Sequence, residues 1–305
     1  MNKIFALPAL ALLYTLTACD GSSGGSSGGD DEARLSLGIT DGPVENASAV
    51  VISFTSIELK GPETTLIEFE EAKTLNLLEF QGEDRSLLLD NQQLAIGDYQ
   101  WIRLGVNEAD SYIVIDGIQH ALSIPSSAKS GLKLNRGFTA GAGSSSNFTI
   151  EFDLRKSVHQ QGNGIYKLRP TLRLVDNLDV NSIKGVVAAN LVTDVACNNG
   201  DNNDMGNVVY LFSGHDAAIQ DIQGNDGDPL TSATVSYNSS SEQYQFTLGF
   251  IPVGDYSVAF SCDASLDINT EDNSAANTQG NDVVSFTAGV NVSVTADSAA
   301  NITIN

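Results

Sequence analysis

The sequence predicts an all-β protein made of two tandem antiparallel β-sandwiches of the immunoglobulin-like or transthyretin-like kind, behind a signal peptide and a flexible linker. Two patterns lead to this prediction. Apolar and polar residues alternate with a period of two in many short runs. Gly, Ser, Asn and Asp recur between these runs, and such residues are typical of turns.

Length, composition and charge set the limits of this prediction. The chain has 305 residues, which is enough for two domains, and 41% of them are hydrophobic, which excludes global disorder. It carries 38 acidic and 15 basic side chains, a net charge of −23. A surface this acidic repels phosphate backbones, so nucleic acid is excluded as a partner.

Residues 1–18 have the features of a lipoprotein signal peptide. Lys3 precedes a short apolar stretch, Ile4–Leu13, which is too short to span a bilayer. The ending Leu16-Thr17-Ala18-Cys19 resembles the bacterial lipobox, and this resemblance implies cleavage before Cys19 and acylation of its thiol. Residues 19–33 are rich in Gly and Ser and are expected to form a flexible linker.

This start of the chain predicts a protein of the bacterial cell envelope, anchored in the lipid bilayer through Cys19. An ordinary secretory signal with a chance cysteine is the alternative. Asp20 resembles an inner-membrane retention signal of enteric bacteria, but other lineages apply that rule loosely. The choice between inner and outer membrane, facing periplasm or cell surface, therefore stays open.

Residues 34–178 are expected to form the first sandwich. Alternation predicts strands at Phe148–Leu154 and Leu168–Leu174, the second at a sheet edge because Pro170 lacks a ladder donor. Asp116-Gly117 predicts a tight hairpin, and the change of apolar parity between Phe54 and Ile57 predicts a β-bulge. A helical or irregular piece is expected near 75–78.

Several blocks of this region resemble one bacterial family. They are Thr40-Asp41-Gly42-Pro43-Val44, Leu89-Asp90-Asn91, Leu132-Lys133-Leu134-Asn135, Phe152–Ser157 and Leu168–Asn177. In this order they are similar to domain-of-unknown-function family 4382, which is typically found on secreted lipoproteins. Gly42 stands where the family usually has Ala. The resemblance implies location and fold, because no activity is established for the family.

Basic residues gather between Lys129 and Arg173. One interpretation is a cationic patch for an anionic ligand such as a lipid head group or an acidic glycan, with Lys133, Arg136, Arg155 and Lys156 as its candidate residues. The other is that these side chains are the solvated face of edge strands, or pair with Asp153 and Asp176.

Residues 183–305 are expected to form the second, acidic sandwich, because short alternating runs continue while Lys and Arg are absent from Gly185 onward. The run Phe246–Val258 resembles the carboxypeptidase-regulatory-like class of small transthyretin-like modules. Leu94–Tyr99 in the first region has the same shape as Ile251–Tyr256, which suggests two related sandwiches or convergent turn chemistry.

Cys197 and Cys262 are the only cysteines left once Cys19 is acylated. An even pair in an exported domain predicts a disulfide, with two free thiols as the alternative. The loops around Asp201, Asp204, Asp226 and Asp228 could offer oxygen ligands to calcium, but none has EF-hand spacing and such loops are also ordinary turns. No metal site is therefore predicted, and calcium binding by these loops is kept as the alternative.

No catalytic residue can be named from the sequence. The three histidines, His120, His159 and His215, lie in separate segments, and zinc, nucleotide and redox motifs are missing. The leading hypothesis is a non-catalytic envelope lipoprotein that acts as an interaction or structural module, with an unknown envelope protein or glycan as partner. One alternative is a glycan-binding surface protein, with or without calcium, for which Trp101, Tyr112 and Tyr166 are the few aromatic candidates. The other alternative is a hydrolase.

Overall fold

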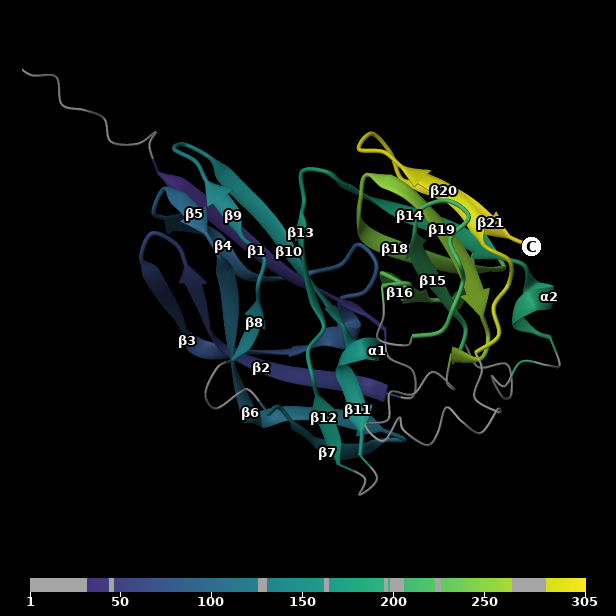
Figure 1. Cartoon of the computed structure of the whole chain (residues 1–305). Helices are drawn as coiled ribbons and strands as arrows, with labels where there is room; N and C mark the ends of the chain where they lie inside the picture. Colours follow the sequence, from purple (N-terminus) through teal and green to yellow (C-terminus); the bar gives the residue numbers. More distant parts are fainter. Residues whose placement is uncertain are drawn as a thin grey trace, which may run out of the picture.

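The computed structural model describes residues 32–43, 47–125, 131–161, 165–194, 197, 206–222, 226–264 and 284–305. Residues 1–18, Cys19 and most of the expected linker lie outside this part of the chain. Two β-sandwiches stand side by side (Figure 1), so the all-β prediction is confirmed. No helix in the described residues is long and apolar enough to cross a bilayer.

The first sandwich packs two sheets and a small ribbon around one hydrophobic core. One sheet has the order β13-β10-β1-β4, the other β11-β12-β7-β6-β2-β3 with β8 on β6, and β5 pairs β9. The elements are β1 (Ala33–Gly42), β2 (Ala47–Lys60), β3 (Thr64–Asn76), η1 (Leu77–Glu79), β4 (Ser86–Leu94), β5 (Gly97–Tyr99), β6 (Trp101–Ile115), β7 (Ile118–Ser123), β8 (Leu132–Leu134), β9 (Phe138–Ala140), β10 (Ser145–Asp153), α1 (Leu154–Ser157), β11 (Val158–Gln160), β12 (Tyr166–Leu168) and β13 (Leu172–Asp176).

Local sequence signals place most turns and bends of this sandwich correctly. Asp116 and Gly117 both have positive φ, 51° and 74°, and close the β6–β7 hairpin. The register of β2 on β3 shifts between Phe54 and Ser56, where the bulge is expected. Pro170 lies between β12 and β13, which belong to different sheets, so the predicted single strand 168–174 is two strands. Without a donor at Pro170 the ladder is interrupted, and the chain crosses from one sheet to the other.

Strand pairing departs from the expected antiparallel arrangement in three places. β1 pairs β10 in parallel, as do β12 with β7 and β14 (Val180–Val187) with the final strand β21 (Ala300–Ile304). In each case the two strands are far apart in the sequence, so no hairpin turn dictates their direction. The sheets are therefore mixed.

The second sandwich packs the sheets β17-β18-β14-β21 and β16-β15-β19-β20 around its own core. Its remaining elements are α2 (Ala189–Val192), β15 (Val208–Ser213), β16 (Thr231–Thr234), β17 (Ser236–Asn238), β18 (Gln243–Pro252), β19 (Gly254–Ser261) and β20 (Val290–Val294). The predicted disulfide is present between Cys197 and Cys262, whose Cα atoms are 5.3 Å apart. It links the chain after α2 to the end of β19.

The similarity between Leu94–Tyr99 and Ile251–Tyr256 is structural as well as sequential. The Tyr99 hydroxyl donates to the Ala95 carbonyl oxygen at 3.0 Å, and the Tyr256 hydroxyl donates to that of Pro252 at 2.9 Å. The Asp before each tyrosine accepts a hydrogen bond from a hydroxyl directly across the ladder, from Thr139 and from Ser293 respectively. Each sandwich therefore contains the same tyrosine corner, which fixes a strand start against its preceding turn.

The boundaries differ slightly from the expected ones. β1 begins at Ala33, which is fully buried, so the fold starts one residue before position 34. The second sandwich starts with β14 at Val180 rather than at 183, and the junction is only residues 177–179. Asn177 is bound to the first sandwich through hydrogen bonds with Asn147 and Thr149. A junction this short and this well bonded restricts motion between the two sandwiches.

Candidate binding site between the sandwiches

Arg155 anchors the first sandwich to the second. It lies in α1, is only 3% exposed, and donates from Nη1 to the Ala264 carbonyl oxygen at 3.1 Å. Its guanidinium carbon also lies 5.2 Å from the ring centroid of Tyr210 in β15. The neighbouring Lys156 donates from Nζ to the Pro229 carbonyl oxygen. Two consecutive cations of the first sandwich therefore bind backbone and aromatic groups of the second.

β15 explains why a buried cation is needed at this point. Val209 and Leu211 face the core of the second sandwich, whereas Tyr210 and Phe212 face the opposite side and are also buried. Phe286 covers part of that side, with its ring centroid 5.1 Å from that of Tyr210. Arg155 covers another part, and a guanidinium stacks on an aromatic face more favourably than it packs on an aliphatic one.

A second set of contacts joins the turn after η1 to β14 and β18. Glu83 accepts hydrogen bonds from Lys184 Nζ and Ser182 Oγ, each at 2.7 Å. The bond from Lys184, followed by that from Ser182, lowers the pKa of the Glu83 carboxyl. Lys184 and Glu83 are 43% and 54% exposed, so this ion pair contributes at most about 1 kcal/mol.

The backbones of the two sandwiches also approach closely here. A Cβ atom added to Gly249 would lie 1.8 Å from the Gly82 carbonyl oxygen. Any other residue at position 249 would push the sandwiches apart. The seam between them, formed by Arg155, Lys156, Glu83 and the Gly82–Gly249 contact, therefore has a defined width.

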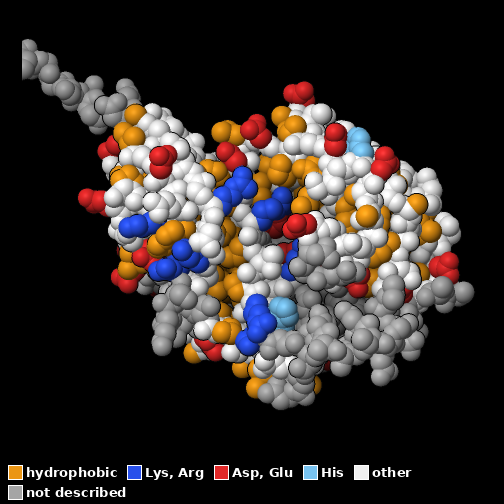
Figure 2. All heavy atoms as spheres, viewed as in Figure 1, with side chains coloured by type: hydrophobic (Ala, Val, Ile, Leu, Met, Phe, Trp, Pro, Cys, Tyr) orange, Lys and Arg blue, Asp and Glu red, His pale blue; other side chains and the backbone are white. Residues whose placement is uncertain are grey.

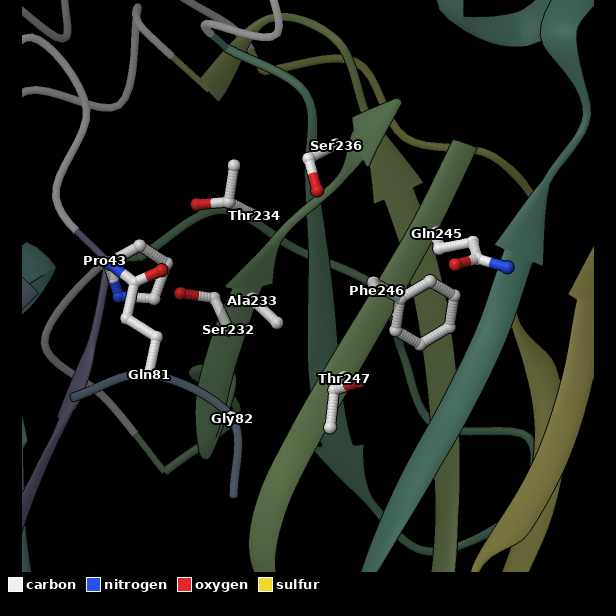
Figure 3. Close-up of a pocket in the computed structure, with 10 residues that line it drawn as sticks. All are labelled: Pro43, Gln81, Gly82, Ser232, Ala233, Thr234, Ser236, Gln245, Phe246 and Thr247. Carbon is white, nitrogen blue, oxygen red and sulfur yellow. The ribbon is translucent and has the colours of Figure 1, made fainter. Parts of the chain in front are cut away.

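A cavity of about 280 Å³ opens along this seam (Figure 3). The first sandwich supplies Pro43, which follows β1, and the turn residues Gln81 and Gly82. The second supplies the facing walls from three strands: Ser232, Ala233 and Thr234 of β16, Ser236 of β17, and Gln245, Phe246 and Thr247 of β18. Figure 3 shows the Gln81 side chain on one side of the gap and Ser232 on the other.

The lining is polar but contains no charged side chain. Its side chains present hydroxyl groups from β16, β17 and β18 and two carboxamides, from Gln81 and Gln245. Gln245 Oε1 accepts a bond from Asn238 Nδ2 at 3.0 Å, which leaves its NH₂ group as a donor. The arrangement suits a ligand that both donates and accepts hydrogen bonds and carries no net charge.

A buried carboxyl lies at the end of β1, next to this seam. Asp41 is 5% exposed, and neither of its oxygens has a hydrogen-bond partner among the described residues. Burial raises the pKa of Asp41 well above its ordinary value, and repulsion from Asp153 adds to the rise. Burial also raises the pKa of Asp153, in opposition to the attraction of Lys156. Burial and the neighbouring Asp153 thus both disfavour the charged form of Asp41 where the first sandwich meets α1.

The first sandwich is similar to a known domain family. Residues 32–170 match the family model described as "Domain of unknown function (DUF4382)". This match runs from the start of β1 to the chain crossing at Pro170, and it confirms the resemblance carried by the motif blocks. The seam residues Gln81, Glu83 and Arg155 all belong to the DUF4382 region.

Two pilins also align with most of the chain. They are the minor pilin GBS52 of Streptococcus agalactiae (10% identity, 88% of this chain and 94% of that chain, TM-score 0.18) and the major pilin subunit BcpA of Bacillus cereus (10% identity, 90% and 99%, TM-score 0.20). TM-scores this low carry no argument about this protein. A comparison with curated proteins found no match.

The basic patch expected in the DUF4382 region does not form as a unit. Arg155 and Lys156 are wrong as ligand-binding candidates, because the second sandwich covers the end of β10 and engages both side chains. Lys133 and Arg136 are exposed. In Figure 2 the Lys and Arg side chains lie over the first sandwich and the seam, and the second sandwich away from the seam shows acidic side chains instead.

Lys133 belongs to a different cluster, around the single tryptophan. Lys133 Nζ lies 4.9 Å from the ring centroid of Trp101, and Arg103 Cζ lies 4.5 Å from it. Glu58 neutralises Arg103 through an ion pair at 2.6 Å. Of the other aromatic candidates, Tyr166 is buried against His120, and Tyr112 lines a separate hollow of about 480 Å³ beside the β6–β7 hairpin.

The acidic loops show no metal cluster where the structure can be judged. Asp201 and Asp204 lie outside the described residues. Asp226 and Asp228 are described, and no group of three potential metal ligands occurs anywhere in the described ranges.

One histidine lies beside a serine and an aspartate, but the geometry is not that of a hydrolase triad. Ser293 Oγ and Asp255 Oδ1 both approach His215 Nε2, at 3.3 and 3.5 Å, and Ser293 donates directly to Asp255 at 2.6 Å. In a triad the carboxylate holds the other ring nitrogen, so that the imidazole relays the proton. In this protein the hydroxyl and the carboxylate share one ring nitrogen, beside the tyrosine corner of Tyr256.

Sequence reasoning missed the cavity altogether. Gln81 lies more than a hundred residues from Ser232 and Gln245, and none of the three lies in a recognisable motif. The only available signal was the pair Gly82 and Gly249, which permit the close approach of the two backbones.

Proposed function

We propose that this protein is a lipid-anchored, non-catalytic module of the bacterial cell envelope that binds or supports another envelope component. Acyl chains on Cys19 hold it in the bilayer, and several such chains bind essentially permanently. The fold begins at Ala33. A Gly/Ser linker of this length spans about 20 Å, so the sandwiches stand clear of the head groups.

The observation that carries this proposal is the seam. Arg155 and the Gly82–Gly249 contact hold the two sandwiches at a fixed separation. The short junction of residues 177–179 restricts their relative motion. Two sandwiches joined in this way form one extended body. Such a body is suited to presenting a surface at a distance from the membrane.

The anchor is tested by labelling with a palmitate analogue in a bacterial host. Wild type should incorporate label and remain with the membrane fraction, whereas Cys19→Ala should lose both properties. Cys197→Ala is the matched control, because it removes a cysteine without touching the signal, and it should label normally. Equal labelling of wild type and Cys19→Ala would refute acylation at this residue.

The partner is best sought by crosslinking intact envelopes before purification of the wild type. A specific envelope protein or glycan should be recovered with wild type and not with Cys19→Ala. The uncharged cavity favours one further candidate function, glycan binding at the seam, and gives it a definite location.

A further inference from the structure

The cavity at the seam is formed by both sandwiches. It exists only because two sandwiches meet, and its walls come from both of them: Gln81 and Pro43 from the first, β16 and β18 from the second. At about 280 Å³ it is slightly smaller than most ligand pockets, which range over about 300–1,000 Å³. It can therefore hold one ring-sized group rather than an extended chain.

The side chains around it are free to bind a ligand. Within the described part of the chain, the side chains of Gln81, Ser232 and Thr234 make no hydrogen bond, so their polar groups face the cavity or its water. Ser236, at the mouth, is exposed. A hydroxyl group both donates and accepts hydrogen bonds, and a carboxamide donates from its NH₂ group and accepts at its oxygen. Such groups match the hydroxyl groups of a sugar.

The charge of the site selects against ionic ligands. In a protein of net charge −23, an anion would be repelled over long range, and none of the lining side chains is a cation that could bind it. None of the lining side chains is a carboxylate either, so a cation or a calcium-bridged sugar would lose hydration without compensation.

The site is already formed before any ligand arrives. Lys184 and Ser182 hold Glu83, the residue after Gly82, and the Gly82–Gly249 contact sets the distance between the walls. A preformed cavity avoids the entropic cost of ordering its walls on binding.

We propose that this seam cavity binds one uncharged sugar residue of a glycan, without calcium. Gln81 and Ser232 bind the sugar hydroxyls from opposite walls, and Gln245 donates from its NH₂ group. The inference rests on the glycan-binding candidate named above, and it can fail while the lipid anchor stands, because binding and acylation are measured separately.

The test measures sugar binding to the full chain by saturation-transfer NMR and calorimetry, in a detergent without a sugar head group. The probes are glucose, galactose, mannose, N-acetylglucosamine and their β-linked disaccharides, with glucuronate as the charged comparison. At least one neutral probe should bind, and chelation with EDTA should leave its affinity unchanged. Gln81→Ala with Ser232→Ala should weaken binding about tenfold, since two hydrogen bonds are lost.

Gln93→Ala is the matched control, because Gln93 is exposed on the edge strand β4 of the same sandwich. It should bind like wild type. Ser236→Trp, which obstructs the mouth without touching the seam contacts, should abolish binding while leaving the unfolding midpoint unchanged. Lack of binding by every neutral probe, preference for glucuronate, loss of binding with EDTA, or binding unaffected by the cavity substitutions would each overturn the proposal.

Discussion

Replacing Arg155 by Ala tests whether the two sandwiches form one body. The substitution removes the bond from Nη1 to the Ala264 carbonyl oxygen and the contact with the Tyr210 ring. Both partners belong to the second sandwich, whereas Arg155 belongs to the first. The loss should therefore weaken the coupling between the sandwiches rather than the core of either.

The expected magnitude follows from burial. Arg155 is 3% exposed, so its interactions are little screened by solvent. A hydrogen bond from a charged donor contributes about 1.5–3 kcal/mol, and a desolvated cation–π contact about 2 kcal/mol. Removing both should lower the free energy of unfolding by about 3–5 kcal/mol. Asp41 and Asp153 also lose a neighbouring positive charge, which raises the pKa of each further.

Urea unfolding followed by two probes provides the assay. The single tryptophan, Trp101, lies in the first sandwich, so its fluorescence reports that sandwich alone. Far-UV circular dichroism reports both. In wild type the two curves should coincide, and in Arg155→Ala they should separate, with the second sandwich unfolding independently of the first.

The control is Arg136→Ala, an exposed arginine of the same sandwich. It should shift neither curve by more than about 0.5 kcal/mol. Coincident curves in Arg155→Ala with a similarly small shift would refute the role given to Arg155, and so would separated curves in wild type.

Three more outcomes are expected. Asp41 has a raised pKa in the folded state, so above the ordinary value near 3.8 the unfolded chain ionises first and the free energy of unfolding falls as pH rises. Asp41→Asn should reduce this slope in urea titrations between pH 4 and 8, leaving the contribution of Asp153, and parallel pH profiles would contradict the reasoning. Replacing Cys197 and Cys262, 65 residues apart, by Ala should cost about 4 kcal/mol in urea unfolding, and an unchanged midpoint would show that the crosslink does not constrain the unfolded chain. Tyr99→Phe and Tyr256→Phe should each lower the free energy of unfolding by about 1 kcal/mol by calorimetry, and a neutral effect at both would remove the tyrosine corners as stabilising features.

Features set by neighbouring residues were predictable. The hairpin at Asp116-Gly117 and the bulge after Phe54 each depend on backbone preferences of a few residues. The cysteine pairing was also predictable, because only two cysteines remain after Cys19. Alternation identified the strands, since one buried face imposes a period of two.

The sequence alone thus determined the fold class, the turns and the disulfide, because short-range sterics and the burial of one strand face act within a few residues. Only the tertiary structure decided the parallel pairing of β1 with β10 and the fate of Arg155. The group that Arg155 binds is 109 residues away along the chain. The sequence around a basic side chain at a strand end does not distinguish one that is covered by water from one that is covered by a second sandwich. The same holds for a glutamine such as Gln81. The packing of the two sandwiches determines which group each of these side chains contacts.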